Sequence, residues 1–357
     1  MKLMNTTKVL SILFLGILFS ACRPTQKDPP LDMKVARQDV RVDTLTLESR
    51  SQLETLGAAT IWKTTTGKNP DGTRVKIAIV GTGVDYTIPD LREALWVNPG
   101  ELGDTKSANQ KDDDVNGFAD DVIGYDFYSG DAFPYDWHGA DTYVASVIAA
   151  TGRTNSKVLG LAPNAELMIA RYIGPDGTAN GYDAAMALEY AFHNGAKVIY
   201  FNWPQGGFTA DADPLILSVF KAAEAKGVPI VVPAGNGSNQ NLPRFLMAAS
   251  KLTNVIVVAG LEADGRLTRT TNYGKAFASV GAPVEAIGYL PGAQVTTELR
   301  STATAAAYAT AATALLSTMP KLVSAQKIRA ELVSKSRGSK DASAPDILSA
   351  GSIYLGN

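Results

Sequence analysis

Side chains able to carry out acid–base or nucleophilic chemistry are few in this sequence of 357 residues. It contains two histidines, His138 and His193, and a single cysteine, Cys22. One cysteine excludes a disulfide framework, and this small set of histidine and cysteine excludes a Cys/His zinc site. Histidine-dependent catalysis is therefore limited to two candidates. Of these, His193 ends a predicted helix, where a cation is favoured, and we expect it to cap that helix.

Oxygen ligands for a hard cation are concentrated between residues 111 and 121. Asp112, Asp114 and Asn116 stand at ligand positions 1, 3 and 5 of a calcium loop, with Gly117 at position 6 and Asp120 at position 9. The glutamate that closes such a loop at position 12 is replaced by isoleucine. The segment is predicted to be either a calcium site formed by Asp112, Asp114, Asn116 and Asp120 or an acidic solvated turn.

Nucleotides and nucleic acids are not expected as ligands. Gly81 and Gly83 follow an apolar run, as in a dinucleotide-binding turn, but Tyr86 stands where the third glycine should be. The net charge is −2 and the isoelectric point is about 5.8, so the chain lacks the basic character typical of nucleic-acid-binding domains.

The elements that must position these residues alternate between strands and helices from about residue 56 to residue 330. The apolar runs are rich in β-branched residues and too apolar to alternate, which is typical of strands buried on both faces of a parallel sheet. The alternation predicts an α/β fold with a doubly wound parallel sheet and helices on both faces. The predicted strands are 75–80, 166–170, 197–201, 229–232 and 255–258, and the clearest helices are 182–194, 214–226 and 302–319.

Three segments in chain order resemble the motifs of the subtilisin-like serine protease (subtilase) family. They are residues 77–91, 138–150 and 301–311, and the linking segments 160–165, 233–237 and 272–274 also match. Together these segments extend across about three quarters of the chain. The resemblance implies a subtilisin-like fold, and it implies that the family's catalytic residues should be sought in the three motifs.

The family's reaction requires an Asp, a His and a Ser in that order. The hydroxyl attacks, the imidazole accepts its proton, and the carboxylate orients the imidazole and stabilises its charge. Aligned with the family motifs, this sequence has Gly81, Ala140 and Ala303 at those positions. An alternative stays open, because a two-residue insertion after Gly139 would align His138 with the family's histidine, and Ser301 lies two residues before Ala303. The alternative is an active serine endopeptidase with a displaced catalytic set.

Two further parts of the family site can be located by the same resemblance. Asn236 stands where the family has the side-chain donor of its oxyanion hole, although Gly-Asn-Gly is also a good strand-exit turn. Asn202, Trp203 and Pro204 replace the family's Ser-Leu-Gly, whose backbone pairs with an extended substrate. Because Pro204 has no N–H to donate and Trp203 is bulky, inherited peptide binding is not expected to be intact.

The first 22 residues have the features of an export signal. Two lysines precede an apolar run of 11 residues, 9–19, which is too short to span a bilayer. The run ends in Phe-Ser-Ala-Cys, which resembles the bacterial lipobox and implies lipidation of Cys22. Ordinary secretion with an incidental thiol is the alternative. Arg23, rather than Asp, after the cysteine favours the outer membrane.

The predicted organisation is a lipoprotein signal peptide at 1–21, an N-terminal tether at 22–50 and a subtilisin-like domain at 51–357. The function expected from these features is that of a catalytically inactive, lipid-anchored subtilase-like protein of the bacterial envelope. It would attach to the membrane through Cys22 and act by binding or scaffolding a protein or peptide partner.

Overall fold

The computed structural model describes residues 27–31, 33, 37–42, 51–337 and 352–356, apart from residues 104, 155–156, 205–206, 239–242, 275, 298 and 323. The predicted signal peptide and the predicted lipidation site Cys22 therefore lie outside the described residues. Among the residues described, no helix combines the length and apolarity needed to cross a membrane.

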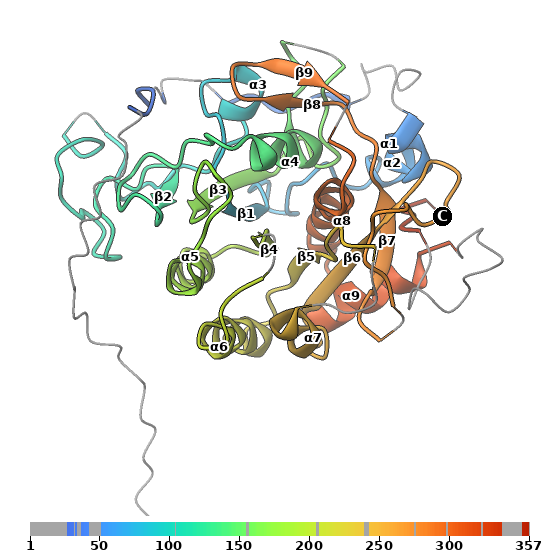
Figure 1. Ribbon diagram of the computed structural model, residues 1–357. Helices are drawn as coiled ribbons and strands as arrows, with labels where there is room; N and C mark the ends of the chain where they lie inside the picture. Colours follow the sequence, from blue (N-terminus) through green and yellow to red (C-terminus); the bar gives the residue numbers. More distant parts are fainter. Residues whose placement is uncertain are drawn as a thin grey trace, which may run out of the picture.

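A seven-stranded, all-parallel sheet forms the centre of the domain, in the order β2-β3-β1-β4-β5-β6-β7 (Figure 1). All five predicted strands are present within a few residues of their expected bounds, and a separate antiparallel hairpin lies at one edge of the domain. The strands are β1 (Lys76–Gly81), β2 (Gly124–Asp126), β3 (Glu166–Arg171), β4 (Val198–Phe201), β5 (Ile230–Pro233), β6 (Val255–Leu261) and β7 (Val280–Pro283), and the hairpin is β8 (Gly288–Leu290) with β9 (Gln294–Thr296).

Helices connect the strands and cover the sheet on both sides, which confirms the predicted α/β architecture. The three predicted helices correspond to α5, α6 and α8. The helices of the described residues are α1 (Ser51–Thr55), α2 (Ala58–Ile61), α3 (Pro89–Arg92), α4 (Ala140–Ala149), α5 (Gly181–His193), α6 (Asp213–Ala225), α7 (Arg244–Ala249), α8 (Thr302–Ser317) and α9 (Ala325–Ser334).

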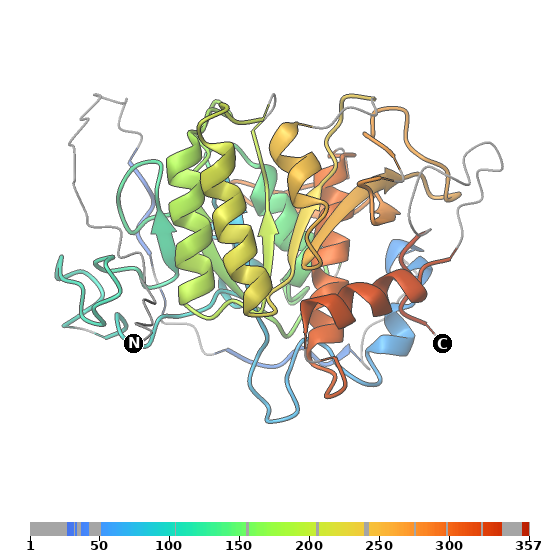
Figure 2. The ribbon, with the colours of Figure 1, turned by 90° about the horizontal axis from the view of Figure 1, so that it is seen from below.

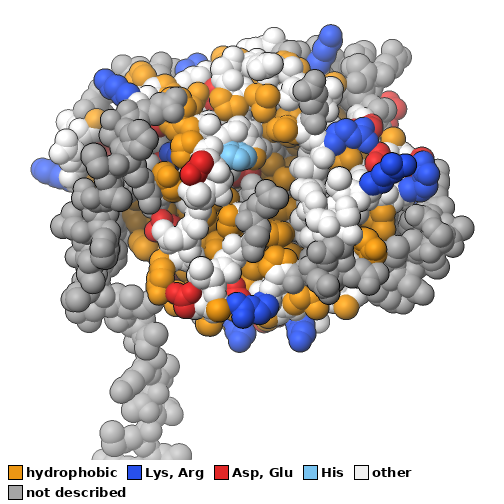
Figure 3. Space-filling view, in the orientation of Figure 1, with side chains coloured by type: hydrophobic (Ala, Val, Ile, Leu, Met, Phe, Trp, Pro, Cys, Tyr) orange, Lys and Arg blue, Asp and Glu red, His pale blue; other side chains and the backbone are white. Residues whose placement is uncertain are grey.

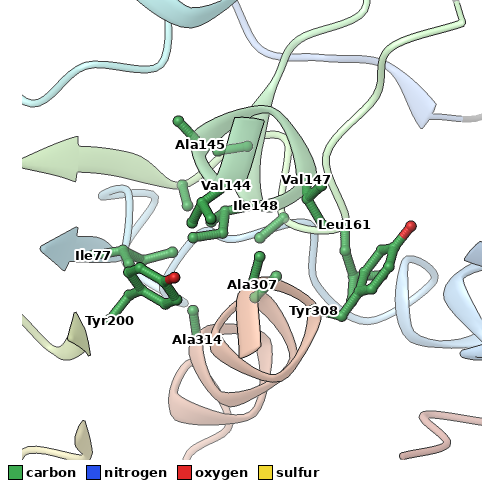
Figure 4. Packing of buried hydrophobic residues seen from close by; sticks show 14 of the residues in the cluster. Ile77, Val144, Ala145, Val147, Ile148, Leu161, Tyr200, Ala307, Tyr308 and Ala314 are labelled. Carbon is green, nitrogen blue, oxygen red and sulfur yellow. The ribbon is translucent and has the colours of Figure 1, made fainter. Parts of the chain in front are cut away.

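The core is divided by the sheet into two layers, because successive side chains of a strand point to opposite faces. Ile77 and Ile79 of β1 face the layer that contains α4 and α8, whereas Ala78 and Val80 face the layer that contains α5, α6 and α7 (Figure 2). The alanine-rich α8 is almost entirely buried and packs closely on Val144 and its neighbours of α4 (Figure 4). Small side chains allow this close approach of α8 to α4 and the sheet.

The carboxyl end of β1 is the topological switch point of the sheet. β1 lies between β3 and β4, with Gly81 opposite Arg171 and Val80 opposite Phe201. The chain winds from β1 to one edge through β2 and β3 and to the other edge through β4 to β7. Ligand sites of open α/β sheets lie outside the carboxyl ends of the strands at such a point.

Candidate functional site

The end of β1 has no room for a side chain at Gly81. A Cβ built on Gly81 would overlap Oδ2 of Asp141 and would lie 2.9 Å from Cβ of Asn202. The space that an aspartate side chain would occupy at position 81 is therefore filled by the carboxylate of Asp141, which comes from the first turn of α4. The carboxylate at the end of β1 thus originates from a different element.

Asp141 is held there by hydrogen bonds from two segments. Its Oδ2 accepts from the main-chain N–H of Thr82 at 2.5 Å, and its Oδ1 accepts from Nδ2 of Asn202 at 2.9 Å. The main-chain N–H of Asp141 in turn donates to Oγ1 of Thr82 at 3.0 Å. Burial and the nearby charge of Asp136 raise the pKa of Asp141 to about 7. The base of the site therefore contains a fully buried carboxylate that accepts hydrogen bonds from neutral donors.

The first turn of α4 is fixed by the buried side chain of Asp136. Oδ1 of Asp136 accepts from the N–H groups of His138 and Gly139, at 3.0 and 2.7 Å, and Oδ2 accepts from both the N–H and the hydroxyl of Thr142. Gly139 has φ 97°, which favours glycine, and a Cβ there would lie 3.3 Å from Pro291. This turn leaves Ala140 half-buried and His138 exposed.

The start of α8 contains the third motif and contacts the end of β5. The N–H of Thr302 donates to Oδ1 of Asn236 at 3.0 Å, and the Oγ1 of Thr302 accepts from the N–H of Gly235 at 3.0 Å. Asn236 is exposed, and within the described chain its Nδ2 has no protein partner. Ala303 follows directly and is half-buried. The side-chain amide of Asn236 therefore lies beside the helix end that carries Ala303.

Trp203 fills the space between the ends of β4 and β5. Its Nε1 donates to the carbonyl of Pro233 at 2.8 Å, and its six-membered ring would lie 2.8 Å from a Cβ on Gly235. An edge-to-face contact with Phe245, with ring centroids 5.8 Å apart, supports the indole from behind. Pro204 is buried next to it. Two of the predicted groove residues therefore place a large side chain, Trp203, and a residue without an N–H, Pro204, beside the ends of β4 and β5.

A hollow bordered by hydrophobic side chains marks the face over these elements (Figure 3). Tyr143 and Tyr308, which belong to the second and third motifs, are both buried. Their hydroxyls donate to the carbonyls of Ala286 and Glu285, at 2.7 and 3.2 Å. Both tyrosines therefore hold the segment before β8.

The acidic segment 111–121 forms a compact loop, in which two of the predicted calcium ligands accept hydrogen bonds from the backbone. The carboxylate of Asp112 accepts from the N–H groups of Asn116 and Gly117, and that of Asp120 accepts from the N–H groups of Asn109 and Gln110. Asp112 and Asp120 therefore hold the turns of the loop.

A different set of carboxylates comes together beside that loop. Ligand oxygens of Glu101, Asp114 and Asp121 lie within 4.8 Å of one another. Glu101 is fully buried; its Oε1 accepts from the N–H of Asp113 at 2.6 Å, and its Oε2 is buried without a partner among the described residues. Burial raises the pKa of Glu101, and it raises the pKa of Asp121 to about 6. The sequence singled out only Asp114 of this cluster.

Comparison with known proteins is consistent with the fold and the order of the motifs. Residues 72–351 match the subtilase family. The chain is 27% identical to subtilisin DY of Bacillus licheniformis over 271 residues, covering 74% of this chain and 84% of that protein. It is 26% identical over 231 residues to the thermophilic serine proteinase of Bacillus sp. strain AK1, covering 65% of this chain, and 26% identical over 229 residues to subtilisin-like protease 1 of Plasmodium berghei, covering 58%.

The protein belongs to the subtilase family, because the match covers most of the chain. It spans 48% of the length of the AK1 proteinase and 37% of that of the Plasmodium protease. The crystal structure of a cold adapted subtilisin-like serine proteinase superposes with a TM-score of 0.62 at 16% sequence identity, covering 82% of this chain and 90% of that one. The subtilisin-like α/β fold predicted from the sequence is thereby confirmed.

Proposed function

We propose that the protein is a catalytically inactive subtilase that acts by binding a protein partner at the bacterial envelope. The observation that carries the proposal is the simultaneous replacement of the three catalytic side chains by Gly81, Ala140 and Ala303. Methyl groups and hydrogen can neither attack a carbonyl nor transfer a proton. The occupation of the Gly81 position by the Asp141 carboxylate supports it further, because the end of β1 no longer has room for the family's aspartate.

A serine endopeptidase with a displaced catalytic set is the competing function. It would require Ser301 to be activated by His138, which calls for a hydrogen bond of about 2.6–3.2 Å between them. In the part of the chain that the structure describes, neither side chain has a hydrogen bond to the other, and Nε2 of His138 points toward the turn at Gly177. A catalytically inactive binding protein is therefore better supported than an active serine endopeptidase.

The binding site we assign is the hollow over the ends of β1, β4 and α8. Ala140 and Ala303 are half-buried in this region, so they present apolar surface where the family has polar groups. Pro204 cannot donate to an extended peptide, and Trp203 occupies the edge between β4 and β5. The partner should therefore contact the hollow through apolar side chains rather than by adding a β-strand.

Site-specific photo-crosslinking tests this assignment in cells. A benzophenone amino acid at Ala303 should give a discrete cross-linked species, whereas the same group at the exposed Lys221 of α6 should not. Equal cross-linking from both positions, or cross-linking from Lys221 alone, would move the interaction surface away from the hollow.

Attachment to the membrane through lipidated Cys22 is part of the same proposal. The lipobox-like Phe-Ser-Ala-Cys and the 11-residue apolar run support it, and Arg23 supports the outer membrane as the destination. A single acyl chain gives only weak membrane binding, so stable attachment relies on the several chains of a bacterial lipoprotein anchor.

We also propose that the acidic loop binds calcium through Glu101, Asp114 and Asp121. Three carboxylates in close proximity are mutually repulsive, and a hard divalent cation that prefers oxygen ligands would neutralise them. The buried, unpartnered Oε2 of Glu101 supplies an oxygen that is costly to leave unpaired. The ion would stabilise the loop between α3 and β2 and take no part in chemistry at the hollow.

A further inference from the structure

The described chain before α1 is bound to the domain. Oδ1 of Asp28 accepts a hydrogen bond from Nε1 of Trp137 at 2.8 Å, and the carbonyl of Pro29 accepts one from the hydroxyl of Tyr86 at 2.7 Å. Leu31 and Met33 pack against the core layer that contains α4 and α8. The predicted tether therefore has a fixed position over this stretch.

The two residues that hold the segment belong to the chain segments that carry former catalytic positions. Tyr86 follows Gly81 by five residues, and Trp137 precedes Ala140 by three. Their rings meet on Tyr135, with centroid distances of 5.4 and 4.7 Å in edge-to-face geometry. Tyr86 is 1% exposed, so losing its bond would leave a buried hydroxyl unpaired.

A second attachment follows in residues 37–42. The N–H of Val40 donates to Oδ1 of Asn164 at 2.7 Å, and its carbonyl accepts from Nδ2 of the same residue at 3.0 Å. Asp39 forms ion pairs with Lys68 at 2.7 Å and with Arg74 at 3.3 Å. The chain before α1 is thus held at two places.

The docked segment shortens the distance over which the predicted anchor can move. Asp28 follows Cys22 by six positions, and because each step along the chain spans at most about 3.6 Å, the two residues are at most about 20 Å apart. A free tether of 28 residues would have a root-mean-square length of about 30 Å and a fully extended length of about 100 Å. Docking at Asp28 therefore limits the distance between Cys22 and the domain to less than the length of the predicted tether would allow.

We propose that this docking holds the rim of the domain beside the start of α4, formed by Trp137 and the exposed His138, within about 20 Å of the bilayer surface. The partner is then a segment of a membrane-inserted protein close to the same leaflet, because a site held this near the lipid is most accessible from the membrane. The inference rests on the lipidation of Cys22 proposed above.

Energy transfer from the protein to the bilayer tests the distance. The purified lipoprotein is placed in phosphatidylethanolamine–phosphatidylglycerol vesicles that carry an acceptor dye on the headgroups. A donor is attached either to His138→Cys, at the exposed rim, or to Lys221→Cys, on the exposed surface of α6 in the other layer. Cys22 does not compete for the label, since its thiol would be consumed by the lipid thioether.

Two insertions of the same eight Gly/Ser residues make the experiment decisive. Placed between Cys22 and Asp28, the insertion should lower energy transfer from position 138, because it adds up to about 29 Å to the free chain. Placed between Val42 and Ser51, it should leave the transfer unchanged, because Asp28, Pro29 and Val40 stay docked. The Asp28→Ala/Tyr86→Phe double variant without an insertion should also lower the transfer from position 138, because its chain is held only at residues 37–42.

Different experimental results would refute this inference and the proposed anchoring. If the two insertions lower the transfer equally in a protein whose Cys22 carries lipid by mass spectrometry, the docked segment does not set the distance and the inference is overturned. If Cys22 carries no lipid and the protein does not float with the vesicles, the anchoring itself fails, and the membrane-facing orientation fails with it.

Discussion

The carboxylate at the end of β1 belongs to Asp141 of α4, because residue 81 is a glycine. In the family pattern the carboxylate is on the residue that ends the first strand, whereas in this protein it comes from α4 and occupies the space above a glycine. Alignment of the first motif predicted that the family's aspartate is missing at position 81. It did not reveal the replacement, because residues 81 and 141 are 60 positions apart and no local pattern connects them.

Substitution at Gly81 should therefore be destabilising, and a change at Asp141 should relieve the effect. Gly81→Asp forces a second carboxylate against Asp141, and we expect a loss of about 3 kcal/mol or more in the free energy of unfolding from overlap and unpaired charge. Gly81→Asp combined with Asp141→Gly should recover most of that loss. Chemical denaturation of the four proteins of this cycle measures the coupling. Additive effects of the two substitutions would contradict the overlap.

The buried Asp141 also predicts a pH dependence of stability. Its pKa is raised to about 7, above the value of about 3.9 in an unfolded chain, so the folded protein binds its proton more tightly. This contribution is fully present below about pH 4 and is lost as the pH rises through 7. Stability should therefore fall from about pH 4 to about pH 7 in the wild type and level off above about pH 8.

Asp141→Asn removes this titration and serves as the comparison. The pKa values of Asp121 and Asp126 are raised to about 6, so they contribute a fall with pH in both proteins. The informative quantity is the difference in unfolding free energy between wild type and variant, which should change by about 1 kcal/mol per pH unit over part of this range. A difference that is constant from pH 6 to pH 8 would argue against a titrating Asp141.

At the scale of elements, continuous apolar runs were sufficient to predict the central strands, and the predicted helices 182–194 and 214–226 agree with α5 and α6 to within one residue at each end. The strands β2 and β7 were not predicted, because their sequences Gly-Tyr-Asp and Val-Gly-Ala-Pro are not continuous runs of β-branched apolar residues. In the acidic loop, ligand spacing drew attention to Asp112 and Asp120, which bind backbone N–H groups. The converging set includes Glu101, which precedes the loop and fits no loop motif.

Calcium binding by the acidic loop can be tested by thermal unfolding and calorimetric titration. Calcium at about 100 times its Kd should add about 2.7 kcal/mol to the free energy of unfolding, and a chelator should reverse the gain. Glu101→Gln should weaken calcium binding at least tenfold, whereas Asp71→Asn, at an exposed carboxylate elsewhere, should not. Unchanged affinity in Glu101→Gln would show that the cluster is not the site.

For the molecule as a whole, the fold is that of the subtilase family, and the role at a membrane is a proposal that rests on the predicted lipidation of Cys22. The tether predicted from its prolines and charges is partly docked, because Asp28, Pro29 and Val40 find partners that only the folded domain provides. The composition of the tether does not predict these hydrogen-bond partners, because they come from distant parts of the chain.

Removal of the predicted lipid site should release the protein from the membrane. Cys22→Ala is expected to move the protein from the outer-membrane fraction to the soluble envelope fraction, while the domain unfolds at an unchanged temperature. Fractionation, together with the mass of the mature N-terminus, provides the measurement. A wild-type protein that is soluble and lacks lipid would support ordinary secretion instead.

The most direct test of the central claim is exposure of the purified mature protein to a fluorophosphonate probe, which reacts with activated serines. The account predicts no stoichiometric labelling of the wild type under conditions in which an active subtilisin is fully labelled. Ser301→Ala should behave like the wild type. Stoichiometric labelling of the wild type that is lost in Ser301→Ala would contradict the account and establish a displaced catalytic serine.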